Sequence, residues 1–429
     1  MDKRAGIFLI FIATLILSGC NGFAGFFINP NQPGGGGGTG TGTSTTSGYF
    51  YVLNYGTVNG ANSTAASIEG LQVVKDVLTA ITGGSVSLGA GAQPSAITVS
   101  PNNTFLYVSA LSTGITVFPI STSGALGTAV GTISTTLAQS MQVDSTKQWL
   151  LALSPGTTLG TSILAAYPVN PSTGLLNTGA TAQFLSLPGS PQQLTIAPNN
   201  TYVYVALGGA GTDAIPLSAT STTSTPLGAP MNIPLSTSGS VSATAVAVDP
   251  QTRFLYVGET SALPTAADGN TGGLRLFHIT ASPFALTEIQ NNKVPFASGG
   301  IIPSAILPDS SGDFIYVANK TVNNSTTGNI TGYSILSNST GTTFSVSLVA
   351  NSPFTVSNAV NTAALAEDST HSFVISVNSG TPTSTSTNNT DVAIYHFDKT
   401  NLGSLLSSTA IIGSTGTDPV QAFAVAATH

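Results

Sequence analysis

The feature that most constrains the fold is a phrase that recurs along the chain. It reads "PSAITVSPNNTFLYVSA" from Pro94, "PQQLTIAPNNTYVYVAL" from Pro191 and "ATAVAVDPQTRFLYVGE" from Ala243. A short aromatic and apolar element within it, of the FLYV type, occurs seven times, with its aligned position at residues 51, 107, 151, 204, 256, 316 and 375. The copies follow one another at 44 to 60 residues. This spacing is close to the period of about 40–50 residues that one propeller blade needs.

Each copy contains the same succession of strand and turn patterns. An alternating segment such as "AITVSP" comes first, and "PNNT", "PQTR" or "DSSGD" follows it as a turn. The FLYV element is the second strand, a segment such as "GITVFPI" is the third, and a looser fourth follows "STSGALG". Four antiparallel strands per copy, repeated seven times, predict an all-β seven-bladed β-propeller over residues 49–429.

The two ends of this region complement each other. The first element, "FYV" at residues 50–52, has no strand before it, and the final "DPVQAFAVAAT" has no element after it. We therefore expect the C-terminal strand to join the N-terminal blade, which closes the ring without leaving an open edge. A pair of β-sandwiches with Greek-key connections is the alternative fold, but it does not explain seven units with complementary ends.

These motifs resemble a known family. The pattern P-x-x-I-x-V-x-P-x-x-x-F-L-Y-V, then I-x-V-F-x-I and S-T-S-G-A-L-G, is similar to lactonase-type seven-bladed propellers, which include bacterial 6-phosphogluconolactonases and YVTN-repeat surface propellers. The resemblance covers nearly all of residues 49–429 and implies the propeller fold. Because the matching residues are core and turn positions, it transfers no catalytic residue to this chain.

The N-terminus has the pattern of a lipoprotein signal peptide. Lys3 and Arg4 precede an apolar run over residues 5–16, and "LSGC" ends at Cys20, the one cysteine of the chain. We predict a signal peptide at residues 1–19 and lipidation of Cys20, which would attach the protein to a membrane of the bacterial cell envelope. A plain signal peptide followed by a buried cysteine is the alternative.

A tether is expected between the lipid anchor and the propeller. Residues 20–48 contain the low-complexity segment "NPNQPGGGGGTGTGTSTTSG", which has too few large apolar residues to fold. Asn21 stands where an aspartate often retains lipoproteins at the inner membrane, so the outer membrane is favoured if the host has two membranes. We expect the propeller to be a monomer.

Composition excludes several classes of function. The chain has 9 basic and 16 acidic residues, and a sparse, acidic charge does not suit nucleic acid, which needs clustered Lys and Arg. None of the four histidines falls in an HxH or HExxH spacing, so no metal is expected. The five consecutive glycines lack the lysine of a phosphate loop, and a single tryptophan does not suit quinone-cofactor propellers. No cofactor is therefore predicted.

A ligand site is predicted at one mouth of the ring. We expect the residue that ends each second strand to face the loops over that mouth. On one arc of the ring, these residues have side chains that can form hydrogen bonds. The predicted site consists of Asn54, Glu259, Asn319 and Asn378, with Asp268 and Lys320 from the longer loops. Glu259 would be a base or acceptor, and therefore a candidate catalytic residue, while Lys320 would be the cation. The alternative is that strand-end asparagines satisfy only local backbone groups.

Three functions remain open. The main prediction is a tethered propeller that binds an envelope protein or a glycan. The alternative is a lactonase-like hydrolase, which needs a base to activate water and positive groups to stabilise the oxyanion. Arg253 and Arg275 are the only arginines outside the signal peptide, so a non-phosphorylated lactone suits the chain better than a sugar phosphate. A structural or adhesive role is the third.

Overall fold

The computed structural model describes thirteen segments of the chain: residues 48–56, 65–74, 76–133, 137–177, 182–219, 225–237, 240–263, 266–289, 294–325, 327–337, 344–380, 390–412 and 421–429. Two units are distinguished, residues 1–43 and residues 44–429. The predicted signal peptide, Cys20 and nearly all of the tether lie outside the described residues. Within the described segments, no helix is long and apolar enough to cross a membrane.

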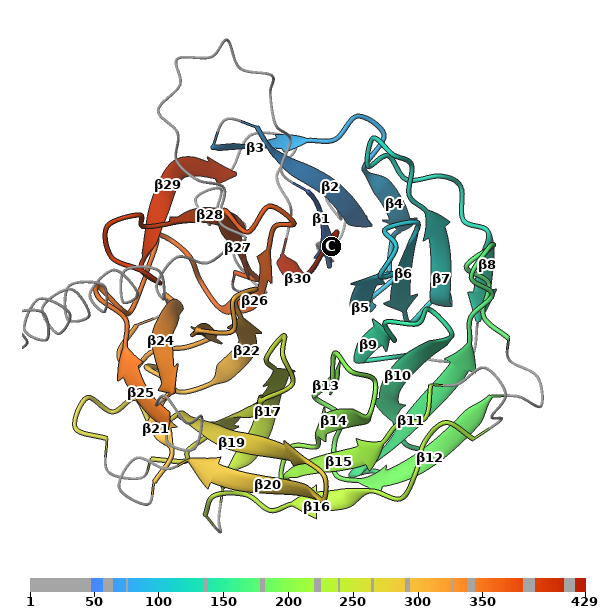
Figure 1. The fold of residues 1–429 in the computed structure, drawn as a ribbon. Helices are drawn as coiled ribbons and strands as arrows, with labels where there is room; N and C mark the ends of the chain where they lie inside the picture. The colour runs from blue at the N-terminus through green and yellow to red at the C-terminus, as the bar shows by residue number, and fades with distance from the viewer. Residues whose placement is uncertain are drawn as a thin grey trace, which may run out of the picture. The chain divides into compact units, whose positions relative to one another are not determined.

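The second unit is a ring of seven sheets (Figure 1). Each sheet contains four antiparallel strands, and two sheets carry an additional short strand. The strands nearest the centre contact one another in a closed cycle, β30–β5–β9–β13–β17–β22–β26 and back to β30. The prediction of a seven-bladed, four-stranded all-β propeller is confirmed.

The strands of each blade follow the order of the chain. Blade 1 contains β1 (Tyr49–Asn54), β2 (Ala66–Val74), β3 (Val77–Ala80), β4 (Val86–Gly89) and β30 (Ala422–Ala427). Blade 2 contains β5 (Pro94–Val99), β6 (Phe105–Ala110), β7 (Gly114–Pro119) and β8 (Gly131–Ile133). Blade 3 contains β9 (Ser140–Val143), β10 (Trp149–Pro155), β11 (Thr161–Pro168) and β12 (Gln183–Pro188). Blade 4 contains β13 (Gln193–Ile196), β14 (Tyr202–Ala206), β15 (Thr212–Pro216) and β16 (Met231–Ile233).

The remaining three blades have the same order. Blade 5 contains β17 (Ser242–Val248), β18 (Phe254–Thr260), β19 (Gly273–Ala281), β20 (Phe284–Ile289) and β21 (Phe296–Ala297). Blade 6 contains β22 (Pro303–Pro308), β23 (Phe314–Asn319), β24 (Asn329–Ser337) and β25 (Phe344–Leu348). Blade 7 contains β26 (Thr362–Glu367), β27 (Phe373–Asn378), β28 (Val392–Phe397) and β29 (Leu405–Ile412).

The closure of the ring is also as expected. β30 pairs antiparallel with β1, with Val425 opposite Val52. The amide of Thr428 donates to the Tyr49 carbonyl at 2.8 Å, and the amide of Tyr49 donates to the Thr428 hydroxyl at 2.8 Å. The C-terminal strand therefore supplies the innermost strand of the first blade.

The aromatic residues of the repeat hold neighbouring blades together. Tyr107 in blade 2 donates its hydroxyl to the Gly174 carbonyl of blade 3 at 3.0 Å. Gly174 has a φ of 70°, and a Cβ atom there would lie 2.6 Å from the ring of Phe105. A glycine is therefore needed beneath the aromatic pair. Equivalent hydroxyl–glycine bonds join Tyr51 to Gly124 and Tyr316 to Gly403. The FLYV and STSGALG motifs are thus the two halves of one contact between blades.

A second set of contacts joins the innermost strands. β5, β17, β22 and β26 each have an irregularity near their start. In three of these strands, the hydroxyl of the residue at this point donates a hydrogen bond to a backbone carbonyl of the next blade, at 2.6 to 2.7 Å. The pairs are Ser95 with Ala138, Thr244 with Pro303 and Ser304 with Thr362. In β26 the same position is Ala363, which has no hydroxyl.

The two faces of the ring are named here by their connections. The turn face carries the turns between first and second strands, at residues 100–104, 144–148, 197–201, 249–253, 309–313 and 368–372. Turns of adjacent blades are hydrogen-bonded to each other there, for example Asn200 to Asp144. The loop face carries the connections between second and third strands, and the predicted site was placed on this face.

Candidate functional site

The four predicted strand-end residues lie between blades. Asn54, Glu259, Asn319 and Asn378 are all at most 2% exposed. Alternate residues of a strand point to the same side, and Val52 belongs to one apolar cluster with Val377 of blade 7. Asn54 therefore lies at the boundary of blades 7 and 1. The same alternation places Glu259, Asn319 and Asn378 at the boundaries of blades 4 and 5, 5 and 6, and 6 and 7 respectively.

Glu259 belongs to a buried ion network. Its carboxylate accepts a hydrogen bond from Arg275 Nη1 at 3.1 Å and two from Ser236, from the amide at 3.2 Å and from the hydroxyl at 2.5 Å. Arg275 also binds both carboxylate oxygens of Glu288, at 2.7 and 3.0 Å, and the Pro234 carbonyl at 2.6 Å. Glu259 therefore fastens the connection between blades 4 and 5, and a role as base would require it to release these partners.

The three asparagines bind neighbouring groups. Asn319 donates to the Ser298 carbonyl at 2.6 Å and to Asn329 Oδ1 at 2.8 Å. The side-chain amide of Asn378 donates to the Thr390 carbonyl and accepts from the Thr362 hydroxyl, both at 2.8 Å. Asn54 donates to the Ser67 hydroxyl at 3.2 Å. Two of these contacts, with the Ser298 and Thr390 carbonyls, are to backbone groups as in the alternative interpretation, and the other three are to side chains.

Asp268 and Lys320 are the exposed members of the predicted site. Asp268 accepts hydrogen bonds from the amide and the side chain of Asn270, at 3.0 and 2.9 Å, and these bonds lower the pKa of its carboxyl. None of the described residues lies within hydrogen-bond distance of the Lys320 ammonium. The two residues carry opposite charges on the loop face, where a ligand site stays a prediction.

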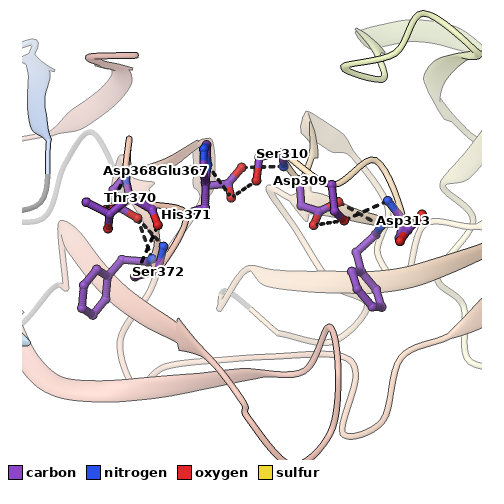
Figure 2. A network of polar contacts seen from close by, with 11 residues as sticks. Asp309, Ser310, Asp313, Glu367, Asp368, Thr370, His371 and Ser372 are labelled. Carbon is purple, nitrogen blue, oxygen red and sulfur yellow. Dashed lines mark hydrogen bonds and ion pairs between the residues drawn. The ribbon is translucent and has the colours of Figure 1, made fainter. Parts of the chain in front are cut away.

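A different set of chemically active groups meets on the turn face (Figure 2). Four of its turns begin with an aspartate that accepts the amide hydrogen of the aromatic residue five positions later. The pairs are Asp144 with Trp149, Asp249 with Phe254, Asp309 with Phe314 and Asp368 with Phe373, at 2.6 to 3.0 Å. A short acidic side chain that caps its own turn explains why Asp recurs at this position.

The turns of blades 6 and 7 are joined through Glu367, the last residue of β26. Its carboxylate accepts hydrogen bonds from the Ser310 amide at 2.9 Å and the Ser310 hydroxyl at 3.1 Å. His371 Nδ1 lies 3.3 Å from Oε1 of the same carboxylate. Burial raises the pKa of Glu367 to about 8, with a further contribution from the charge of Asp309. Burial also raises the pKa of Asp309 itself.

His371 contacts Glu367 through one ring nitrogen and is partly exposed. Its side chain is 45% exposed, whereas that of Glu367 is 11% exposed. His371 has a φ of 55°, in the left-handed region, and its amide donates to the Asp368 carbonyl at 2.9 Å. Because Nδ1 faces the carboxylate, Nε2 is the nitrogen that can exchange a proton with a bound molecule. A buried carboxylate behind an accessible imidazole is an arrangement that produces a general base.

The other histidines have different surroundings. The ring of His278 packs against Phe254 and Phe344, and His396 Nδ1 is buried without a hydrogen-bond partner among the described residues. Burial lowers the pKa of His429, whose backbone is bound by Asn103. Within the described segments, the His371–Glu367 contact is the one imidazole–carboxylate pair. No group of three or more His, Cys, Asp or Glu side chains is placed to hold a metal there.

The spacing of the four histidines in the sequence did not single out His371. The available signal was the spacing of Glu367 and His371, four residues apart across one of the turns that begin with Asp. The contact from Ser310 could not be foreseen, because 57 residues separate it from Glu367 and only the packing of two blades brings them together.

Comparison with known proteins identifies the family. The model of the family described as "Lactonase, 7-bladed beta-propeller" matches residues 88–357. The chain belongs to this family. The resemblance stated from the repeat motifs is therefore confirmed for this lactonase-family propeller, while no curated protein matches it in sequence.

Solved structures show the same fold in distant relatives. The periplasmic gluconolactonase of Pseudomonas aeruginosa aligns with a TM-score of 0.64 and 13% identity, over 89% of this chain and 99% of that one. A putative 6-phosphogluconolactonase of Bacteroides fragilis aligns with a TM-score of 0.66 and 11% identity, over 91% and 100%. A putative 6-phosphogluconolactonase of Bacteroides uniformis aligns with a TM-score of 0.64 and 11% identity, over 88% and 98%. At these identities the likeness concerns the fold alone.

Proposed function

We propose that this lactonase-family propeller hydrolyses a non-phosphorylated lactone at the turn face, with His371 as the general base and Glu367 as its partner. The observation that carries the proposal is the contact between the accessible imidazole and the buried carboxylate, at 3.3 Å. Family membership supplies the class of reaction. Hydrolysis therefore takes precedence over ligand binding, which was the main prediction from the sequence.

The chemistry follows from the arrangement of the two side chains. In the active form, His371 Nδ1–H donates to the Glu367 carboxylate, which leaves a lone pair on Nε2. Nε2 takes a proton from water as the water oxygen bonds to the lactone carbonyl carbon. When the tetrahedral intermediate collapses, the ring C–O bond breaks and the imidazolium returns its proton to the departing alkoxide. The product is the open hydroxy acid.

The charge around this site disfavours a phosphorylated substrate. Asp368 lies in the same turn as His371, and Asp309 and Asp313 lie in the adjacent turn of blade 6 (Figure 2). The nearby cation, Arg253, is already bound by Asp249 at 2.7 Å through Nε. A phosphate group would therefore meet several carboxylates without a free guanidinium, and like charges repel at such distances. An uncharged lactone does not incur this repulsion.

Kinetics on purified full-length protein test the proposal. We expect hydrolysis of an uncharged sugar lactone such as glucono-δ-lactone, above the spontaneous rate, and little hydrolysis of its 6-phosphate. His371→Gln should lower kcat/KM by about 100-fold or more, as loss of a general base does. His278→Gln is the matched control, because that imidazole packs against two phenylalanines and forms no ion pair with a carboxylate among the described residues. Full activity in His371→Gln would rule out this assignment.

The same assay separates the two faces of the ring. Lys320→Ala changes an exposed loop-face residue and should leave hydrolysis unchanged. A loss of activity in Lys320→Ala together with a fully active His371→Gln would place the reaction at the loop face, with Glu259 as the candidate base. A protein or glycan that binds the wild type but not Lys320→Ala would support the ligand-binding role predicted from the sequence.

We also propose that the chain is attached to a membrane of the bacterial cell envelope through lipidated Cys20. The support is the order of basic, apolar and LSGC segments at the N-terminus. In cells fed a labelled fatty acid, the wild type should incorporate label and sediment with membranes. Cys20→Ser should do neither, and equal labelling of the two would contradict the proposal.

A further inference from the structure

Ser310 contacts the candidate site from a different blade. It lies in the turn of blade 6, directly after Asp309, and both of its donors point at Glu367 of blade 7 (Figure 2). The amide binds Oε2 at 2.9 Å and the hydroxyl binds Oε1 at 3.1 Å. Oε1 is also the atom that His371 Nδ1 approaches, at 3.3 Å. One serine thus fixes the plane of the carboxylate and shares an oxygen with the imidazole.

We infer that Ser310 and Asp309 are positioning residues, which together set the ionisation and orientation of the Glu367–His371 pair from across the boundary between blades 6 and 7. This inference rests on the proposed function. Neither residue touches the reacting atoms. Ser310 donates two hydrogen bonds that favour the charged carboxylate, whereas the negative charge of Asp309 disfavours it.

The groups that face Glu367 come from both blades. The turn of blade 7 contributes Asp368 and His371, the turn of blade 6 contributes Asp309 and Ser310, and β23 contributes the buried Tyr316. The negative charge of Asp368 also raises the pKa of Glu367, by less than that of Asp309. The pKa of Tyr316 is raised well above its usual value, so the tyrosine is neutral where Glu367 titrates. Asp309 and Ser310 are therefore the principal opposing influences from blade 6.

Substitutions of Ser310 and Asp309 should shift the pKa of Glu367 in opposite directions. Removing the hydroxyl with Ser310→Ala should raise the pKa of Glu367 by about one unit, because one donor to the anion is lost. Asp309→Asn should lower it by about one unit, because a neighbouring negative charge is lost while the amide oxygen can still cap the turn. Ser145→Ala is the matched control. Ser145 follows Asp144 as Ser310 follows Asp309, but it lies in blade 3 and its side chain is exposed.

The titration can be measured without any assay of activity. The chain has four glutamates, Glu69, Glu259, Glu288 and Glu367, so labelling with glutamate that carries ¹³C at the side-chain carboxyl gives few signals. Comparison with Glu367→Gln assigns the resonance of Glu367. We expect midpoints displaced upwards in Ser310→Ala, downwards in Asp309→Asn and unchanged in Ser145→Ala. Shifts below 0.3 unit in both test variants, or shifts in the same direction, would overturn the inference.

Kinetics then distinguish failure of the inference from failure of the proposed function. If both are correct, the midpoint of the pH profile of kcat/KM moves with the carboxyl midpoint in each variant. Opposite carboxyl shifts in a protein that hydrolyses no lactone would uphold the positioning role and refute the lactonase. If the protein hydrolyses the lactone but the titration midpoint of Glu367 is unchanged by both substitutions, the positioning role alone is refuted. A purely structural contact would lower stability without moving either midpoint.

Discussion

Replacing Glu367 by glutamine removes a titrating group while keeping its size and its ability to accept hydrogen bonds. Glutamine resembles the protonated acid, which burial and the charge of Asp309 favour in the folded protein. The pKa of Glu367 is raised from 4.5 to about 8 on folding. The native state therefore binds an additional proton between these two pH values, and the unfolded chain does not.

The sign of the effect follows from this difference. A group whose pKa is raised on folding contributes stability below its unfolded pKa, and that contribution is lost as pH rises through the folded pKa. For each pH unit between the unfolded and the folded pKa, the unfolding free energy of the wild type falls by about 1.4 kcal/mol. From pH 4.5 to pH 8 or above, the wild type should therefore lose about 4–5 kcal/mol of unfolding free energy relative to Glu367→Gln. Other titrating groups are common to both proteins and cancel in the comparison.

Urea unfolding of both proteins, at half-unit intervals from pH 4.5 to 9 and constant ionic strength, measures this difference. With a shared m-value, the gap between the two midpoints gives the difference in free energy directly. The two curves should nearly coincide at pH 4.5 and diverge above it, with the glutamine variant the more stable. Parallel curves would show that Glu367 keeps its usual pKa. If the unfolding free energy of the wild type instead rises relative to that of the variant with increasing pH, the carboxylate is stabilised in the folded state. Either result refutes the reasoning.

Three further predictions concern hydroxyl groups at the boundaries between blades. Tyr107→Phe removes the hydrogen bond to the Gly174 carbonyl and should cost about 1–2 kcal/mol. Tyr204→Phe removes a buried hydroxyl that has no partner among the described residues and should be neutral or stabilising, so similar urea midpoints for the two variants would contradict this account. Ala363→Ser places a hydroxyl at the position from which Ser304 bridges to the next blade, and a gain of about 0.5–1 kcal/mol is expected. Slower amide exchange in β26 and β30 would support that gain, and a loss of stability would show that blade 1 offers no acceptor within reach.

The fold could be predicted from the sequence because its signals are local. Alternation with a period of two, turn residues and the FLYV element all lie within one copy of the repeat, and seven copies fix the number of blades. The closing pair of β1 and β30 was also predictable, because each end lacks one strand. Even the contact between Tyr107 and Gly174 joins two motifs that recur at matching places in successive copies.

The orientation of the strand-end residues was harder to predict. Alternation separates the two sides of a strand, but both sides of a second strand are covered by neighbouring blades. Asn54 is 2% exposed, and Glu259, which is 1% exposed, lies between blades with Arg275 as its partner. An alternating pattern cannot distinguish such a boundary from the mouth of the ring. The predicted site consequently combined two exposed residues, Asp268 and Lys320, with four buried ones.

The candidate site at Glu367 arises from a turn that the fold needs in several blades. The residue before the turn aspartate is Val143 in blade 3, Val248 in blade 5 and Pro308 in blade 6, and it is a glutamate only in blade 7. The residue three positions after that aspartate has a positive φ in each of these turns, and in blade 7 it is His371. Because the turn fixes this backbone, the imidazole is held beside the carboxylate without a dedicated loop. The turn aspartate of blade 6 is required to fold its own turn, and its charge also acts on Glu367. The same side chain therefore serves folding in one blade and ionisation in the next, which is why a substitution such as Asp309→Asn must be judged by a titration as well as by stability.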